Sequence, residues 1–385
     1  MTAETTGPLS GFAPDWTRSL TDPQAFREEQ RRLEHVWTFL GLRDDLARDG
    51  DWFRASIATR SVFVQRFGDE LRGFENLCVH RFHPLRREAK GNGPVICGYH
   101  HWHYNREGRA VGIPICNVVF GKPPHAMDAQ LRKIDLATCG QLIFGRFPAR
   151  GATRTLEDYL GETFPILEAL VPKQEPRLYW ERSIRANWRL NFHITLEEYH
   201  GQVVHPKTFG RYGYATSMER YQYFRLGPHS AYMDSSDSNC FRQLLEGCRD
   251  GTYRSSHYFI LQILPDFILA HAKADSSFWF LNLLQYSPAA HDRTAFRGWC
   301  WPAPFESDLS RLAQATRPLT DIFRRPIYGH YFRQIVNQDA AVCERIQEVA
   351  HQIDGVPILG AQEQRIGWFE ESLRALAAES SRETR

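Results

Sequence analysis

The pattern of hydrophobic and polar residues predicts different elements in different parts of the chain. Residues 22–40 carry a stripe of apolar side chains among Glu and Arg residues, which predicts an amphipathic helix. From about residue 50 to residue 147 the pattern changes to short strand-like runs, and Gly68-Asp69-Glu70 between two of them predicts a hairpin. This block predicts a small all-β domain, followed by a candidate linker at 148–155.

The remainder of the chain mixes two patterns. Runs rich in aromatic and β-branched residues predict strands at 179–184, 221–226, 258–264, 267–273 and 277–286. Amphipathic stretches predict helices at 186–200, 306–316, 332–353 and 362–378. Because the strands are largely grouped between helices, this part predicts an α+β domain on an antiparallel sheet.

Composition narrows the class of protein. The chain has 385 residues, of which 42% are hydrophobic and 24% charged, so it can build a packed core and is not disordered or collagen-like. Its net charge of +2 gives no electrostatic reason to expect nucleic acid or an anionic membrane as a partner. No apolar run approaches about 18 residues, and no secretory signal is visible. We therefore expect no membrane span and a cytoplasmic protein, whose 8 cysteines are thiols or metal thiolates.

Two cysteine–histidine pairs form the first candidate metal site. Cys78-Val79-His80 is followed, after 16 residues, by Cys97-Gly98-Tyr99-His100, and each pair ends a candidate strand. Two thiolates and two imidazoles suit tetrahedral zinc, or an iron–sulfur cluster with Cys on one iron and His on the other. Both pairs run Cys then His, whereas zinc fingers more often group Cys-Cys and then His-His. The order favours the cluster over zinc, and over two buried cysteines beside exposed histidines.

A second set of metal-ligand residues lies in the predicted helix 186–200. At about 100° per residue, His193, Glu197 and His200 share one face of that helix. His205 follows five residues later, where neighbouring Gly and Pro residues predict that the helix ends and the imidazoles converge. The alternative is an ordinary helix with polar residues toward solvent.

Asp339 falls on the apolar stripe of the predicted helix 332–353. A carboxylate on a buried helix face costs several kcal/mol unless it is paired or bound to a metal. Two histidines and one such carboxylate make the set that leaves open positions on iron(II). The alternative is an ion pair with a buried arginine such as Arg333.

These two motifs, in this order, resemble the alpha (oxygenase) subunit family of the Rieske non-haem iron aromatic ring-hydroxylating oxygenases. The resemblance covers nearly the whole chain, from residue 22 to about residue 375. It implies one [2Fe–2S] cluster per chain, with Cys78 and Cys97 on one iron and His80 and His100 on the other.

The resemblance also implies one mononuclear Fe(2+) per chain, with His200, His205 and Asp339 as its ligands. Glu197 stands where the family places the acid that bridges to a neighbouring subunit's Rieske histidine, so we expect a catalytic role in electron delivery. Glu198 next to it is expected to point away and to tolerate substitution.

Three positions depart from the family pattern. Phe82 and His101 stand where the family usually has glycine, and we expect both to crowd the cluster. His193 stands where relatives commonly have Asp or Glu, and we expect it to line the substrate pocket or to support a ligand; the alternative is that it is a spare ligand itself.

The fold implied by the resemblance is α+β in two domains with an extension. We expect an N-terminal helical segment at 1–44 that packs on the catalytic domain, an all-β Rieske domain at 45–150, and a catalytic domain at 151–385. The catalytic domain is expected to have the helix-grip fold, with a curved antiparallel sheet around a long helix.

The implied function is that of an oxygenase component. It uses O2, and electrons from NAD(P)H through a separate reductase with or without a ferredoxin, to hydroxylate a small organic, aromatic substrate. No nucleotide-binding glycine fingerprint is present in this chain. The family implies a homotrimer. The alternatives are dealkylation or hydroxylation of a quaternary ammonium or natural-product substrate, a Rieske electron carrier with a ligand-binding domain, and a zinc-stabilised binding module.

Overall fold

The chain forms two compact units. The structure is a computed structural model that describes residues 12–149, 154–173, 176, 178–206, 220–253, 257–275, 278–302 and 311–383. One unit, here called the β unit, runs from Gln30 to Tyr159, and the other, the α+β unit, combines the residues up to Glu29 with Leu160–Glu379. Their limits differ from the expected ranges, since residues 30–44 fall in the β unit. The predicted linker at 148–155 lies partly outside the described residues.

A seven-stranded antiparallel sheet forms the body of the β unit, in the order β1-β10-β9-β4-β3-β2-β5. Its strands are β1 (Thr38–Leu42), β2 (Asp51–Ile57), β3 (Arg60–Phe67), β4 (Glu70–Glu75), β5 (Lys90–Asn92), β9 (Lys133–Cys139) and β10 (Leu142–Arg146). The predicted hairpin is confirmed, because β3 and β4 pair on either side of Gly68, whose φ of 59° suits glycine.

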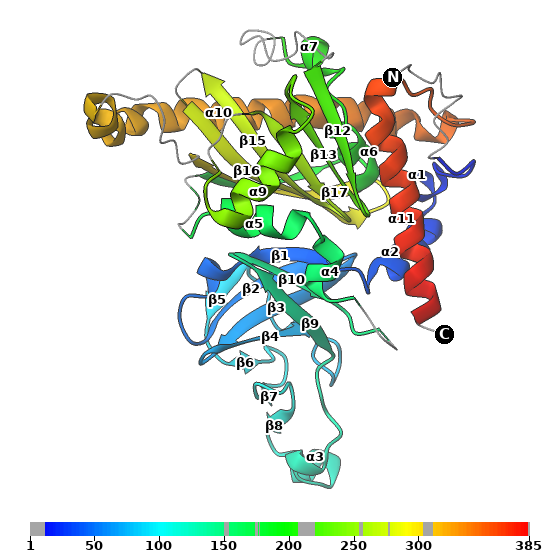
Figure 1. Ribbon diagram of the computed structural model, residues 1–385. Helices are drawn as coiled ribbons and strands as arrows, with labels where there is room; N and C mark the ends of the chain where they lie inside the picture. The colour runs from blue at the N-terminus through cyan, green and yellow to red at the C-terminus, as the bar shows by residue number, and fades with distance from the viewer. Residues whose placement is uncertain are drawn as a thin grey trace. The chain divides into compact units, whose positions relative to one another are not determined.

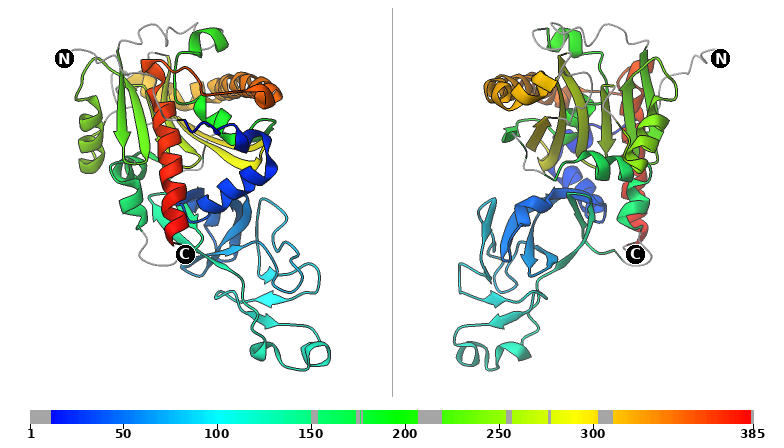
Figure 2. Two further views of the ribbon diagram at one scale, coloured as in Figure 1. Left: turned by 90° about the vertical axis from the view of Figure 1, so that its right-hand side faces the viewer. Right: turned by 60° about the vertical axis from the view of Figure 1, so that its left-hand side comes forward.

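A smaller sheet carries the second of the two cysteine–histidine loops, and the first follows β4 of the large sheet. The smaller sheet comprises β6 (Val95–Ile96), β7 (His103–Tyr104) and β8 (Ala110–Gly112), and helix α3 (Cys116–Phe120) follows it. Figure 2 shows these elements together at one end of the unit. The apolar run at 95–104 is therefore two short strands joined by a turn, and that turn contains Cys97 and His100.

The α+β unit is built on a second seven-stranded antiparallel sheet, in the order β11-β17-β16-β15-β14-β13-β12 (Figure 1). The strands are β11 (Leu178–Ile184), β12 (Tyr221–Leu226), β13 (His229–Asp234), β14 (Phe259–Ile263), β15 (Phe267–Asp275), β16 (Phe278–Ala290) and β17 (Arg293–Pro302). All the strands predicted for this unit correspond to members of the sheet. Strands β13 and β17 were not predicted.

Helices surround this sheet. In chain order they are α1 (Arg18–Thr21), α2 (Pro23–Leu33), α4 (Leu156–Leu160), α5 (Thr163–Leu170), α6 (Trp188–His193), α7 (Gly201–Val204), α9 (Cys240–Asp250), α10 (Arg311–Val349) and α11 (Gln364–Glu383), with α2 and α4 crossing the limits of the units. No helix among the described residues is long and apolar enough to cross a membrane.

Several predicted helices have other limits in the structure. The first ends at Leu33, because the β-branched and aromatic residues that follow pair as β1 instead of continuing the helix. The helices predicted at 306–316 and 332–353 are one helix, α10, which continues through Pro318 and Pro326. Residues 306–310 of the first prediction lie outside the described residues.

The predicted helix 186–200 is interrupted, and this affects the candidate site. Helix α6 ends at His193, and turns follow. The Thr195 hydroxyl donates to the Phe192 carbonyl at 2.6 Å, and the Glu197 carboxylate accepts from the His200 N–H at 3.0 Å. Such local side-chain bonds compete with the helical ladder, so the candidate ligands lie on turns around the short helix α7.

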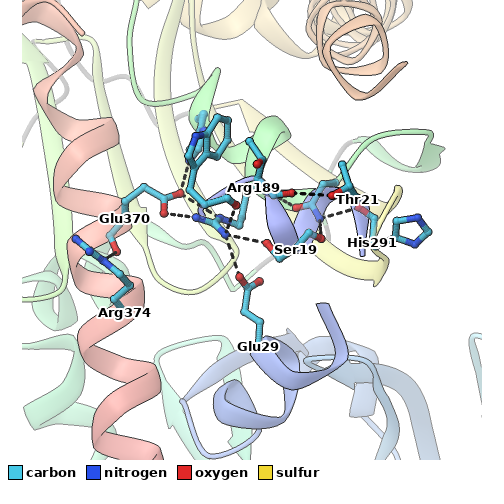
Figure 3. Close-up of polar contacts among 11 residues, drawn as sticks. Ser19, Thr21, Glu29, Arg189, His291, Glu370 and Arg374 are labelled. Carbon is cyan, nitrogen blue, oxygen red and sulfur yellow. Dashed lines mark hydrogen bonds and ion pairs between the residues drawn. The ribbon is translucent and has the colours of Figure 1, made fainter. Parts of the chain in front are cut away.

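Buried ion pairs fix α6 against the rest of its unit (Figure 3). Arg189 is 5% exposed, bonds to Glu29 of α2 at 3.0 Å and makes two contacts with Glu370 of α11. His193 Nε2 lies 2.8 Å from the same Glu370 carboxylate. The expectation that His193 lines the substrate pocket is wrong, because the ring is held between Glu370 and the aromatic rings of Phe12 and Phe369.

Candidate metal centres

Two loops of the β unit present the predicted cluster residues with the same backbone arrangement. In each loop the cysteine N–H, of Cys78 or Cys97, donates at 2.9 Å to the carbonyl five residues later. The residue four positions after each cysteine donates its N–H back to the cysteine carbonyl, at 2.9 and 3.0 Å respectively. The two loops are therefore matched supports for side chains that converge on one point.

The residues at that fourth position are Phe82 and His101, which replace the usual glycines. Both have left-handed backbones, with φ of 58° and 53°. A residue with a Cβ is strained there by about 1–2 kcal/mol, which explains why glycine suits the position. Phe82 is 73% exposed, so most of its side chain faces solvent, and the crowding of the cluster stays a prediction.

The four predicted cluster ligands lie together. Cys78 and Cys97 are each 1% exposed, and the rings of His80 and His100 are 4.6 Å apart. The Tyr104 hydroxyl shares a hydrogen bond of 3.0 Å with Cys78 Sγ. Burial raises the pKa of the Cys78 thiol; Tyr104 opposes this rise, and the nearby Cys97 adds to it.

The two imidazoles have ring nitrogens that fit a metal-ligand role. Nδ1 of His80 and Nδ1 of His100 are buried and have no hydrogen-bond partner among the described residues. Burial lowers the pKa of His80, and His100 lowers it further, which favours the neutral form that binds metals. Two buried thiols and two unpartnered imidazole nitrogens match the donor set of a Rieske [2Fe–2S] cluster.

The second centre lies in the α+β unit. His200, His205 and Asp339 each offer one ligand atom, and these atoms lie within 4.8 Å of one another. His205 Nε2 is 2.8 Å and His200 Nε2 3.5 Å from the same oxygen, Asp339 Oδ1. The histidines flank α7 and the aspartate comes from α10, so the fold joins distant parts of the sequence here.

Two neighbouring side chains orient these imidazoles. His200 Nδ1 lies 2.5 Å from Glu197 Oε1, and His205 Nδ1 lies 2.8 Å from Gln338 Oε1. Because carboxylate and amide oxygens accept, both Nδ1 atoms carry a proton, and both Nε2 atoms face Asp339 Oδ1, where a bound metal would take the place of their protons. The sequence reasoning assigned no role to Gln338; its place next to the buried Asp339 was the signal available.

The electrostatics of this centre favour a cation. Burial alone lowers the pKa of His200, but Asp339 and Glu197 outweigh it and raise the pKa to about 10. Burial raises the pKa of Asp339, yet hydrogen bonds from His200 and His205 lower it overall. The residues fit a divalent metal held by two histidines and one carboxylate, with positions left for other ligands.

A cavity of about 90 Å³ adjoins the three residues. Its walls are mainly apolar and include Ile260, Ile268 and Leu284 from the sheet and Phe332 from α10. Glu198 also lines it, and burial raises the pKa of this carboxyl to about 7. The expectation that Glu198 points away is wrong, because it assumed a continuous helix through residues 194–200.

A Rieske non-haem iron protein has two parts. One is a small all-β unit with a Cys2His2 donor set, and the other is an α+β unit with two histidines and one carboxylate beside a cavity. Both parts are present in this chain, and comparison with protein families gives the same result. Residues 36–123 match the Rieske [2Fe-2S] domain, and residues 173–379 match the ring hydroxylating alpha subunit (catalytic domain). The chain belongs to the ring-hydroxylating alpha subunit family, whose cofactors are a [2Fe–2S] cluster and a mononuclear iron.

Curated relatives include two aromatic-acid dioxygenase subunits. The chain is 31% identical, over 199 residues, to subunit alpha 2 of the terminal oxygenase component of terephthalate 1,2-dioxygenase from Comamonas sp, covering 48% of this chain and 47% of the relative. It is 28% identical, over 263 residues, to the large subunit of anthranilate 1,2-dioxygenase from Acinetobacter baylyi, covering 64% and 53%. The chain spans about half the length of the curated relatives it matches.

Solved structures share the fold over almost the whole chain. Naphthalene 1,2-dioxygenase from Rhodococcus sp. superimposes with a TM-score of 0.70 at 20% identity, covering 94% of both chains. The quaternary ammonium Rieske monooxygenase CntA superimposes with a TM-score of 0.68 at 17% identity, covering 97% of this chain and 99% of the other. The predicted fold class, a Rieske domain with a helix-grip catalytic domain, is confirmed.

Proposed function

We propose that this chain is the oxygenase component of a multicomponent Rieske non-haem iron system. It uses O2, and electrons from NAD(P)H through a separate reductase and, where the system has one, a ferredoxin, to hydroxylate a small aromatic substrate. The observation that carries the proposal is the cavity that directly adjoins His200, His205 and Asp339. An electron carrier has no need of a cavity at such a centre, and the relatives named for aromatic acids support this substrate class.

Two metal centres in the chain have different functions under this proposal. Cys78, Cys97, His80 and His100 hold the [2Fe–2S] cluster, and the three residues beside the cavity hold the mononuclear Fe(2+). When bound, the cluster supplies single electrons, and the Fe(2+) supplies the site at which dioxygen is activated. The apolar walls of the cavity exclude water from this site and position the substrate.

Glu197 has a role in electron delivery under this proposal. Its carboxylate accepts from His200 Nδ1–H and from the His200 N–H, and so fixes the ring that faces the metal. In a homotrimer the same carboxylate can also accept a hydrogen bond from His100 of a neighbouring subunit. Glu197→Ala is expected to keep both metal centres and to slow cluster reoxidation in a single turnover, and normal reoxidation would remove the bridging role.

The experiment that tests the proposal compares two carboxylates on α10. Asp339→Ala removes the ligand at the centre, while Glu348→Ala removes an exposed carboxylate nine residues later. We expect the parent and Glu348→Ala to contain the two cluster irons plus one, and to consume O2 when given reductase and substrate. Asp339→Ala is expected to keep the red-brown cluster absorbance, lose the third iron and stop consuming O2.

Other results would contradict the proposal. A parent protein with only two irons per chain is an electron carrier, and a colourless parent that contains zinc is a binding module. If Asp339→Ala retains both the third iron and O2 consumption, the metal is held elsewhere.

A further inference from the structure

A buried arginine of α11 has no ion-pair partner among the residues that the structure describes. Arg365, on α11, is 0% exposed, and its Nε donates to Ser230 Oγ at 3.2 Å. Its Nη1 and Nη2 have no hydrogen-bond partner among the residues that the structure describes. A guanidinium carries five N–H donors and remains charged, so leaving both Nη groups unpaired in a protein interior is costly. This side chain therefore points to an anionic partner that the described part of the chain does not supply.

A second unpartnered donor lies next to this arginine. Ser230 Oγ, which accepts from Arg365, in turn donates to Gln262 Oε1 at 2.9 Å. That bond uses the amide oxygen, and Gln262 Nε2 is left buried with no partner within the described ranges. The ring of Tyr232 lies 5.7 Å from the Arg365 guanidinium carbon. One hydroxyl thus connects two side chains that both offer unused N–H groups.

Strand register places Gln262 and Ser230 on the face of the sheet that also carries residues of the cavity wall. Gln262 of β14 is paired with Ile268 of β15, and Ile268 lines the cavity. Ile260, two residues before Gln262 and therefore on the same face of β14, also lines it. Ser230 is paired with Gln262 on the other side. Ser230 and Gln262 therefore lie on the face of the sheet that also forms the apolar wall, and Arg365 contacts this face through Ser230.

The charge of Arg365 is not neutralised by the cavity's own acid. Glu198 is the carboxylate that acts on Arg365, and no ion pair within 4.0 Å joins the two residues. Burial lowers the pKa of Arg365 to about 10, with Glu198 opposing, so the guanidinium remains a cation at neutral pH.

We propose that Arg365 and Gln262 form an anion-binding subsite of the substrate cavity, and that the substrate carries a carboxylate. The inference rests on the proposed oxygenase function, because it treats the cavity as the substrate site. A carboxylate accepts two parallel N–H bonds from a guanidinium, which Nη1 and Nη2 are free to donate, and a further bond from Gln262 Nε2. The apolar wall beside them would hold the ring of an aromatic acid.

Ligand binding tests the subsite without turnover. The purified holoprotein is titrated calorimetrically, without reductase, with benzoate, salicylate, phthalate and cinnamate, each compared with its neutral carboxamide. At least one carboxylate is expected to bind, at least tenfold more tightly than its carboxamide, because a charge-assisted pair is stronger than a neutral one. Arg365→Gln should weaken that carboxylate at least tenfold and leave the carboxamide unchanged, while Arg365→Lys should keep part of the affinity.

Two further variants keep the test decisive. Arg374→Gln changes an exposed arginine on the same helix and should bind the carboxylate like the parent. Gln262→Leu should weaken the carboxylate severalfold, and it stands in for Arg365→Gln should that variant fail to fold by circular dichroism. The proposal is overturned if no carboxylate in the panel binds, if carboxamides bind equally well, or if the variants bind the carboxylate like the parent.

The experiments distinguish failure of the anion-binding subsite from failure of the proposed oxygenase function. Carboxylate binding that depends on Arg365, in a protein that never consumes O2 with reductase, retains the subsite and rejects the oxygenase. Oxygenation of a neutral substrate that does not depend on Arg365 retains the oxygenase and rejects the subsite.

Discussion

Replacing Glu370 with glutamine should destabilise the α+β unit by about 3 kcal/mol. Glu370 is 1% exposed and accepts hydrogen bonds from Arg189 and His193. Burial raises its pKa, but Arg189 and then His193 outweigh this and lower the pKa from 4.5 to about 2. One pKa unit corresponds to about 1.36 kcal/mol, so this lowering of the Glu370 pKa corresponds to roughly 3 kcal/mol of favourable interaction with the ionised carboxylate. The usual cost of breaking a buried pair, about 3–5 kcal/mol, agrees.

The neighbouring residue provides a matched control. Glu371 pairs with Arg225 at 3.0 Å, but on the surface, where the two side chains are 39% and 46% exposed. Such pairs contribute about 0–1 kcal/mol. Urea unfolding at pH 7.5, followed by tryptophan fluorescence, should therefore show a large loss for Glu370→Gln and a small one for Glu371→Gln.

The pH dependence has a definite sign. Because the pKa of Glu370 is lowered in the folded state, its stabilisation is present above pH 4.5 and is lost as pH falls toward 2. The difference between the parent and Glu370→Gln should therefore shrink in acid. Adding Arg189→Met to Glu370→Gln should cost less than the two single losses together, since both buried charges are then removed. The reasoning is refuted if Glu370→Gln unfolds within 1 kcal/mol of the parent, or no earlier than Glu371→Gln.

Three other predictions concern the metal centres and the sheet. Gln338→Leu removes the acceptor for His205 Nδ1–H and should weaken iron binding about 10–100-fold. Iron retention during dialysis against a chelator measures this affinity. Unchanged retention would contradict the role of Gln338 in orienting His205. His101→Gly relieves the strain of a left-handed backbone at φ 53° and should stabilise the β unit by about 1 kcal/mol. The expected result is a higher melting temperature with unchanged cluster absorbance. A lower melting temperature would show that the imidazole ring stabilises the unit by more than the backbone strain destabilises it. Burial raises the pKa of Asp266 from 3.8 to about 6, although a hydrogen bond from Ser287 opposes this rise. The protonated carboxyl therefore contributes its full stability below pH 3.8, and this stability is lost as the pH rises through 6. Relative to Asp266→Asn, the parent should therefore lose about 3 kcal/mol between pH 4 and pH 7 in urea unfolding, and parallel stability curves would contradict the burial argument.

The local sequence pattern was enough to predict which candidate metal ligands lie close together. The repeated Cys-then-His order favoured one cluster held by both pairs, and in the structure the two pairs lie on loops with the same pattern of backbone hydrogen bonds. Asp339 could be predicted because a carboxylate on an apolar helix stripe needs a partner, and in the structure it contacts both His200 and His205.

The directions of side chains near the breaks in helices could not be predicted. The periodicity of residues 186–200 fits a helix, but Thr195 and Glu197 bond to the backbone and end it early. Glu198 consequently turns into the cavity, and no spacing rule could show that. The contact of His193 could not be predicted for a second reason. Its partner Glu370 is 177 residues away in the sequence, and only the packing of α11 brings the two side chains together.

The alternation of residues along the cavity wall also affects how this protein can change in evolution. Ile260 and Ile268 face the cavity, while Leu261 and Leu269, the next residue along each strand, do not line it and are 1% and 0% exposed within the fold. One set of positions shapes what the cavity accepts, and the interleaved set holds the sheet together. Ligand preference can therefore drift by single substitutions in the first set while the second set stays fixed, so a library restricted to alternate positions should yield new selectivities from variants that still fold.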